Sequence, residues 1–80
     1  MAHRSPLAGD PALLALGAAV RRIREAKGIS QERLALEAQV DRSYVSHIET
    51  GKNNPAVLTL VKLAGAMDVS VADLVAQAGL

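Results

Sequence analysis

Apolar residues recur along most of the chain at spacings of three and four, which is the period of an amphipathic helix. In the segment 11–27 this stripe consists of Leu13, Leu16, Val20 and Ile23. Shorter segments with the same period lie at 31–38, 42–50, 55–67 and 71–78. No segment shows the strict alternation of a β-strand. The pattern therefore predicts an all-α fold, a compact five-helix bundle.

Residues typical of helix starts and ends stand at the borders of these segments. Asp10 precedes Pro11, a combination of N-cap and first helical residue, and Gly28 is placed to end the first helix. Three further starts pair a capping residue with an apolar staple that brackets it. These sets are Ile29, Ser30 and Leu34; Val40, Asp41 and Val45; and Val69, Ser70 and Leu74. For the fourth helix, Asn54 is the predicted N-cap and Pro55 the first residue.

The segment 31–51 combines two short helices with a break of about three residues between them. Leu34, Ala35 and Ala38 share one face of the first, and Val45 and Ile48 share one face of the second. Such small faces bury themselves only by packing on each other and on a third element. The outer face of the second helix then stays free, which is typical of a helix-turn-helix whose second helix enters the DNA major groove.

With 80 residues the chain makes one small domain, predicted over 10–80, and residues 1–9 read as a flexible N-terminal arm. The formal net charge is only +1, but Arg21, Arg22, Arg24 and Lys27 cluster near the end of the first helix. This cluster fits a nucleic-acid partner, and an ordinary solvated surface explains it equally well. No secretory signal or membrane-spanning run is visible, so we expect no membrane association and a cytoplasmic location.

Catalytic and metal chemistry find no support in the residues. The chain has no cysteine, and its two histidines, His3 and His47, belong to unrelated segments. No nucleophile lies near an evident acid–base pair, and no phosphate-binding loop is present. We therefore expect no enzyme activity, no metal and no cofactor.

Three runs of residues carry a resemblance to a known family: 24–31 (REAKGISQ), Leu34-Ala35, and 45–52 (VSHIETGK). With them, the chain resembles the Cro/phage-repressor-like (XRE) helix-turn-helix proteins over roughly residues 16–75. The runs 41–46 and 53–55 look most like the small controller proteins of restriction–modification systems. The resemblance implies a lambda-repressor-like DNA-binding domain that regulates transcription as a homodimer on a near-palindromic operator.

The resemblance also implies roles for individual residues. Base contacts are expected from Arg42, Ser43 and His47, and backbone contacts from Gln31, Tyr44, Ser46, Lys52, Asn53 and Asn54. Arg24 and Glu49 match a structural ion pair between the first and third helices. Two positions depart from the family: Gln39 stands where glycine is frequent, which costs roughly 1 kcal/mol if φ is positive, and Asn53 stands where controllers frequently have arginine.

The residue chemistry leaves alternatives to these roles. Arg42 has the two donors that read guanine, but it also suits a phosphate or an intramolecular pair with Glu49 or Asp41. His47 suits a base, a phosphate or plain solvent. Tyr44 either hydrogen-bonds a phosphate or is a partly buried aromatic that covers the second helix.

Some apolar residues near the C-terminus exceed what a five-helix core needs, and we interpret them as a two-fold dimer interface: Leu58, Val71, Val75 and Leu80. Burial within one chain is the alternative. The second hypothesis for the whole protein is a protein-interaction module, such as the antitoxin of a toxin–antitoxin pair, with a protein partner.

Overall fold

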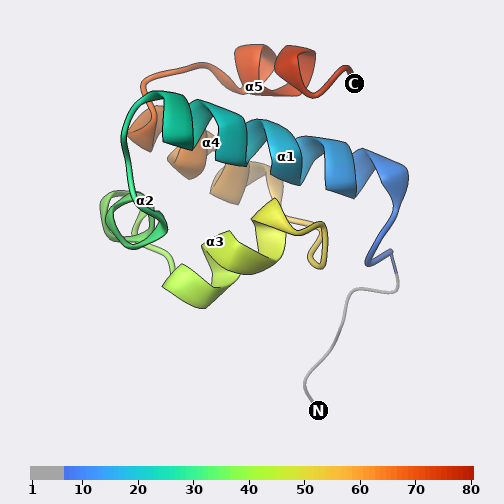
Figure 1. The fold of residues 1–80 in the computed structure, drawn as a ribbon, viewed down its shortest axis with the longest axis horizontal. Helices are drawn as coiled ribbons and strands as arrows, with labels where there is room; N and C mark the ends of the chain where they lie inside the picture. The colour runs from blue at the N-terminus through green and yellow to red at the C-terminus, as the bar shows by residue number, and fades with distance from the viewer. Residues whose placement is uncertain (1–6) are drawn as a thin grey trace.

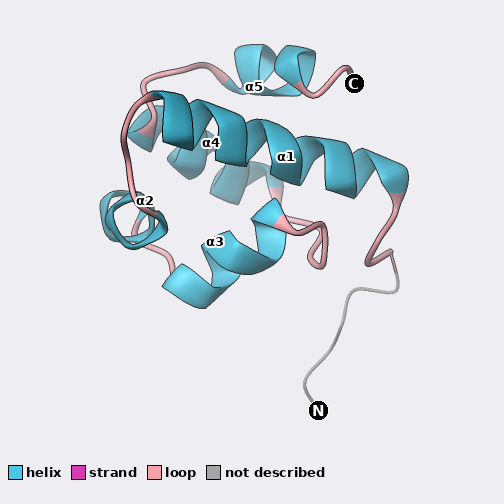
Figure 2. Ribbon diagram, viewed as in Figure 1, coloured by secondary structure: helices cyan, strands magenta, loops and turns pink. Residues whose placement is uncertain are grey.

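The computed structural model describes residues 7–80, and this part of the chain contains five α-helices and no strand. The helices are α1 (Pro11–Ala26), α2 (Gln31–Ala38), α3 (Arg42–Glu49), α4 (Val57–Ala66) and α5 (Val71–Gln77). They follow one another through short loops, as Figure 2 shows. The predicted all-α five-helix fold is confirmed.

The long helix α1 lies in the middle of the bundle and is contacted by α3 and α5. Helix α2 packs on both α3 and α4, and α4 also contacts α5. In Figure 1, α3 and α5 lie on opposite sides of α1. The helix-turn-helix pair α2–α3 therefore forms one side of the molecule, away from the C-terminal helix.

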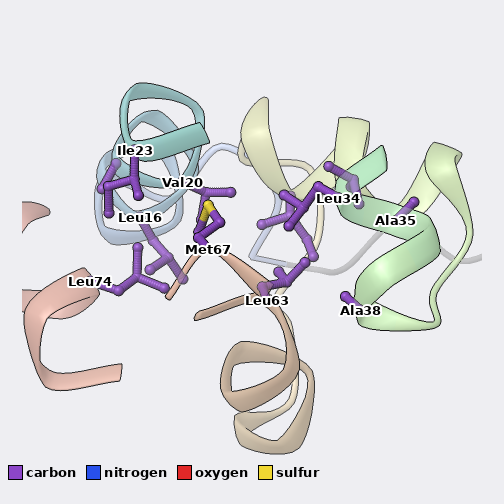
Figure 3. Packing of buried hydrophobic residues seen from close by; sticks show 12 residues of the cluster. Leu16, Val20, Ile23, Leu34, Ala35, Ala38, Leu63, Met67 and Leu74 are labelled. Atoms are coloured by element: carbon purple, nitrogen blue, oxygen red, sulfur yellow. The ribbon is translucent and has the colours of Figure 1, made fainter. Parts of the chain in front are cut away.

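The core collects the predicted apolar faces of all five helices (Figure 3). Its largest fully buried side chains are Val20 of α1, Leu34 of α2, Val45 and Ile48 of α3, Leu63 of α4 with Met67 just after it, and Leu74 of α5. Truncating a buried leucine to alanine typically destabilises a protein by about 2–5 kcal/mol. A domain this small depends on each of these side chains.

Three helix starts have the predicted side-chain caps. The Asp10 carboxylate accepts a hydrogen bond from the Ala12 N–H at 2.8 Å. The hydroxyl oxygens of Ser30 and Ser70 accept from the N–H groups of Arg33 at 3.0 Å and Asp73 at 2.9 Å. Each bond satisfies one of the backbone donors that a helix N-terminus leaves free.

Two details of the predicted helix starts are wrong. Asp41 holds the N-cap position of α3, but its side chain makes no capping hydrogen bond. Helix α4 begins at Val57 after Ala56 rather than at Pro55 after Asn54, because Ala56 stays extended at ψ 153°. Pro55 is buried, so it anchors the connector that leads into α4 instead of opening the helix.

The turn between α2 and α3 depends on a left-handed residue. Gln39 ends α2 with φ 59° and ψ 44°, so the strain expected for a non-glycine residue there is present. An L-residue in this conformation is destabilised by about 1–2 kcal/mol. The Val40 N–H donates to the Ala35 carbonyl at 3.0 Å and closes the end of α2.

The beginning of the described chain is attached next to the end of α3. Residues 7–9 form a turn, and the Gly9 N–H donates to the Gly51 carbonyl at 2.9 Å. The predicted N-terminal arm thus includes three residues that form a turn, and its residues 1–6 lie outside the described part of the chain.

Candidate nucleic-acid interface

Helix α3 has a buried side and an open side. Val45, Ile48 and Glu49 are buried against the rest of the bundle. Arg42, Ser43, His47 and Thr50 are exposed, while Tyr44 and Ser46 are half-buried between the two sides. All three candidate base-reading residues therefore lie on the surface of the molecule.

Four of the predicted contact residues meet in one hollow between α2 and α3. It has a volume of about 410 Å³ and is lined by Gln31, Arg42, Ser43 and Ser46. Gln31 is the first residue of α2, and the other three occupy the first turn and the middle of α3. The helix-turn-helix geometry thus places an amide, a guanidinium and two hydroxyls around a common open space.

Arg42 is available to a ligand. Its guanidinium forms no salt bridge among residues 7–80, and the alternative pairing with Glu49 does not occur because Arg24 occupies that carboxylate. An exposed arginine without an intramolecular partner can offer two donors to a guanine edge or to a phosphate.

Glu49 is the centre of a buried polar network that holds α3 in place. Arg24 donates to both of its oxygens, from Nε to Oε2 at 2.7 Å and from Nη2 to Oε1 at 3.1 Å. The Nη1 of Arg24 donates to the Ile29 carbonyl at 2.8 Å, and the Gln31 Nε2 donates to Glu49 Oε1 at 3.0 Å. The side chain of Glu49 is only 2% exposed. The predicted pair is therefore a buried, two-pronged link between α1 and α3.

The charge of Arg24 is secured by this pair. The hydrogen bond to Glu49 raises the pKa of Arg24 above its ordinary value, against the lowering that burial causes. Because a raised pKa favours the protonated form at every pH below it, Arg24 stays charged throughout the neutral range.

Three of the four basic residues near the end of α1 have partners within the protein. Arg24 is buried, Arg21 pairs with Glu25 at 3.3 Å, and Arg22 donates to the Gln77 carbonyl at the end of α5 at 2.8 Å. Most of this charge is engaged in contacts within the protein. The cluster therefore offers less free charge to a nucleic acid than the sequence suggests, and its role in DNA binding stays a prediction.

The connector after α3 is held in a defined shape. Gly51 adopts φ 73°, and a Cβ atom at this position would lie 2.6 Å from the Leu14 side chain of α1. The Lys52 N–H donates to the His47 carbonyl at 2.9 Å. Lys52 and Asn54 are exposed and Asn53 is half-buried, so all three predicted backbone-contacting residues are at least partly accessible just after α3.

Tyr44 is half-buried and packs against the hydrophobic core. This placement agrees with its reading as the domain's partly buried aromatic. Its hydroxyl makes no hydrogen bond within the described chain, so a phosphate contact through that hydroxyl is compatible with the packing.

The C-terminal apolar residues divide into two groups. Leu58 and Leu80 are 66% and 58% exposed, whereas Val71 and Val75 are half-buried. The sequence reading missed Val57 and Val61, which are 72% and 48% exposed. The spacing of four between them was the available signal, because it puts both on one face of α4 beside Leu58.

The described chain also bears on metal binding and membrane association. Residues 7–80 contain no cluster of three or more histidine, cysteine, aspartate or glutamate side chains that would suit a metal ion. None of the helices in that range is long and apolar enough to span a bilayer.

Comparison with known proteins agrees with this geometry. A family model described as helix-turn-helix matches residues 20–74. The chain belongs to this helix-turn-helix family. The match begins within α1 and ends within α5, so it covers the elements that form the hollow and those that hold α3 in place.

Restriction–modification controllers are among the relatives of this helix-turn-helix protein. It is 40% identical to the control protein C.BamHI of Bacillus amyloliquefaciens over 62 residues, 76% of each chain. The crystal structure of the controller protein C.AhdI from Aeromonas hydrophila matches with 42% identity and a TM-score of 0.77, over 78% of this chain and 94% of that one. The predicted resemblance is confirmed.

A second similar structure is a regulator bound to DNA. SinR, a master regulator for biofilm formation crystallised in complex with DNA, is 38% identical with a TM-score of 0.70, over 74% of this chain and 95% of that one. The helix-turn-helix family to which the chain belongs is one of transcriptional regulators, so the expectation that the protein is not an enzyme is confirmed.

Proposed function

We propose that this sequence-specific DNA-binding transcriptional regulator binds a near-palindromic operator as a homodimer, with residues 42–50 of each copy in a major groove. The observation that carries the proposal is the two-sidedness of α3. Val45, Ile48 and Glu49 fix its inner side, and Arg42, Ser43 and His47 stand free on its outer side.

In this proposal the first turn of α3 reads bases. Arg42 donates twice to the O6 and N7 acceptors of a guanine, and Ser43 and His47 contact neighbouring base edges. Such contacts fix the sequence preference, because each good two-pronged pair is worth about 1–3 kcal/mol of discrimination.

In this proposal, contacts to the DNA backbone come from α2, α3 and the connector that follows α3. Gln31 begins α2, Tyr44 and Ser46 belong to α3, and Lys52, Asn53 and Asn54 follow the end of α3. Phosphate contacts orient a protein on the duplex without reading sequence. The lysine adds a salt-dependent term, whereas the neutral side chains contribute hydrogen bonds.

The dimer is proposed to form through the surface of α4 and the C-terminal end, where Leu58 and Leu80 are exposed. Exposed apolar faces of this kind are typical of interfaces. A two-fold dimer would set two α3 helices about 34 Å apart, which matches one turn of the double helix. Because it binds DNA, we place the regulator in the cytoplasm. No cofactor is part of the proposal.

The second candidate function is an antitoxin-type interaction module. The same exposed apolar residues on α4 favour it, since they would equally cover a protein partner. Stoichiometric co-purification of another protein would support this candidate, and a stable dimer that buries the α4 face would argue against it.

The test is selection of bound duplexes from a random pool, followed by competition between the selected operator and a scrambled duplex. We expect Arg42→Ala to reduce the preference for the operator by about 1–3 kcal/mol. Arg21→Ala is the matched control, because it removes the same charge from an exposed arginine on α1. Equal binding of all duplexes by the wild type would refute the proposal.

A further inference from the structure

We propose that Glu49 is a positioning residue for DNA binding: the buried Arg24–Glu49 pair holds the Gln31 amide at the edge of the DNA-facing hollow. The proposal rests on the proposed function, because it concerns the same surface. It assigns to the buried ion pair a role in presenting a polar group to DNA, in addition to joining α1 and α3.

The contact between Gln31 and Glu49 crosses from the surface to the core. Gln31 is half-buried and lines the hollow together with Arg42, Ser43 and Ser46. Its Nε2 donates to Glu49 Oε1 at 3.0 Å. Glu49 is the last residue of α3 and its side chain is only 2% exposed, so one end of the Gln31 side chain is fixed to a buried group.

The direction of this bond is set by the ion pair. Arg24 donates to both carboxylate oxygens of Glu49, which fixes the plane of the carboxylate as two-pronged pairs do. The Arg24 side chain is itself tied to the Ile29 carbonyl at 2.8 Å. The carboxylate to which Gln31 Nε2 donates is therefore held by Arg24, and Arg24 is held in turn by the Ile29 carbonyl.

The chemistry of the two groups also fixes which way the amide faces. A carboxylate only accepts hydrogen bonds, so the NH₂ end of Gln31, and not its carbonyl, has to face Glu49. An amide nitrogen has two N–H groups, and Glu49 takes one of them. No other hydrogen bond engages the Gln31 side chain within residues 7–80, so the second N–H is available to a phosphate oxygen.

Charge does not oppose this arrangement. A free carboxylate beside the hollow would repel a phosphate, but Arg24 neutralises Glu49 at 2.7 Å. The group that faces the hollow is therefore the neutral Gln31 amide, a hydrogen-bond donor in a fixed position. An exposed glutamine loses rotamer freedom when it is immobilised on binding, at about 0.5–1.5 kcal/mol per side chain. Holding Gln31 beforehand corresponds to about a 2- to 10-fold gain in affinity.

The test compares Gln31→Ala in two backgrounds, using the operator from the selection experiment. In the wild-type background we expect Gln31→Ala to weaken binding to the operator about 2- to 10-fold. The second background is Arg24→Met with Glu49→Leu, because apolar replacement of both partners of a buried pair is frequently neutral or stabilising. There Gln31 has lost its acceptor, and we expect Gln31→Ala to change affinity less than about twofold.

A phosphate scan separates positioning from a merely structural role. Operators in which single phosphates are replaced by neutral methylphosphonates should reveal one phosphate whose loss weakens the wild type but not Gln31→Ala. The Arg24→Met/Glu49→Leu protein should have lost the same sensitivity while retaining its preference for the operator. Equal effects of Gln31→Ala in both backgrounds, or retained sensitivity at that phosphate, would overturn the proposal.

A measurement on the wild type keeps the proposal testable if the double variant does not fold. NMR relaxation of side-chain amides in the free protein should show Gln31 more rigid than Gln39 and Gln77, which are exposed and form no side-chain hydrogen bond. Equal mobility of the three amides would overturn the proposal. Failure of the proposed function is distinct, since it would appear earlier as equal binding of all duplexes.

Discussion

Helices α1 and α3 touch at Gly17, and this contact decides whether Gly17→Ala stabilises or destabilises the protein. Gly17 is buried within α1, facing the last turn of α3. A Cβ atom added there would lie 2.7 Å from the Glu49 carbonyl oxygen, and nearer still to the Ile48 carbonyl oxygen. Both neighbours are backbone atoms, so neither can rotate away, and α3 would have to move as a whole.

The magnitude follows from two opposing effects of Gly17→Ala. Helix propensity favours alanine over glycine inside a helix by about 0.8–1.0 kcal/mol. Overpacking typically destabilises by about 1–3 kcal/mol, and a clash with two fixed carbonyl oxygens belongs at or above the upper end. We therefore expect a net loss of about 2 kcal/mol or more. In a domain of this size each kcal/mol lowers the melting temperature by about 4–8 °C.

Denaturation should be followed at one protein concentration, because the melting temperature of a dimer depends on it. Gly65→Ala is the control: it lies inside α4, and a Cβ atom there has no neighbour within 4 Å. This variant should gain roughly 0.5–1 kcal/mol from propensity alone. If Gly17→Ala is as stable as the wild type or more so, the argument that α3 rests on the bare backbone of α1 is wrong.

Three further predictions follow from the same structure. Gln39→Gly should stabilise the protein by up to about 1 kcal/mol in chemical denaturation. The substitution removes left-handed backbone strain of about 1–2 kcal/mol, but glycine also raises the entropy of the unfolded chain. A lower stability than the wild type would contradict the argument from strain. Glu49→Leu alone should destabilise the folded protein by about 3–5 kcal/mol, and adding Arg24→Met should restore most of that stability. If thermal denaturation shows the double variant to be no more stable than Glu49→Leu, Arg24 and Glu49 do not act as a simple buried pair. If the proposed dimer forms through α4, Leu58→Ser with Val61→Ser should abolish it in analytical ultracentrifugation without reducing helical content, since the two side chains are 66% and 48% exposed. An unchanged dimer would show that the interface lies elsewhere.

The helices were predictable from the sequence where their starts depend on local chemistry. Asp10, Ser30 and Ser70 each cap the helix that follows, and a cap involves residues only two or three positions away. The start of α4 was missed because it depends on packing. Pro55 is suited to open a helix, yet it is buried and Ala56 remains extended, which tertiary contacts decide and local preference does not.

The candidate site divides in the same way. Helical periodicity was sufficient to place Arg42, Ser43 and His47 on the open side of α3. It could not predict that Gln31 bonds to Glu49 or that Arg22 bonds to the Gln77 carbonyl. These contacts join residues 18 and 55 positions apart, and long side chains choose among partners only after the helices have packed.

Because α3 is short, some of its residues affect both protein stability and DNA recognition, whereas others affect recognition alone. An isolated helix of eight residues is marginal in water, so the conformation of α3 depends on the side chains that attach it to the bundle. Changes at Val45, Ile48 or Glu49 therefore alter stability and the presentation of the outer face together. Exposed positions such as Arg42 and Ser43 carry no such constraint, because surface substitutions usually change stability by only about 0.5 kcal/mol. The base preference of this regulator can consequently diverge at its surface while the buried attachment of α3 stays fixed.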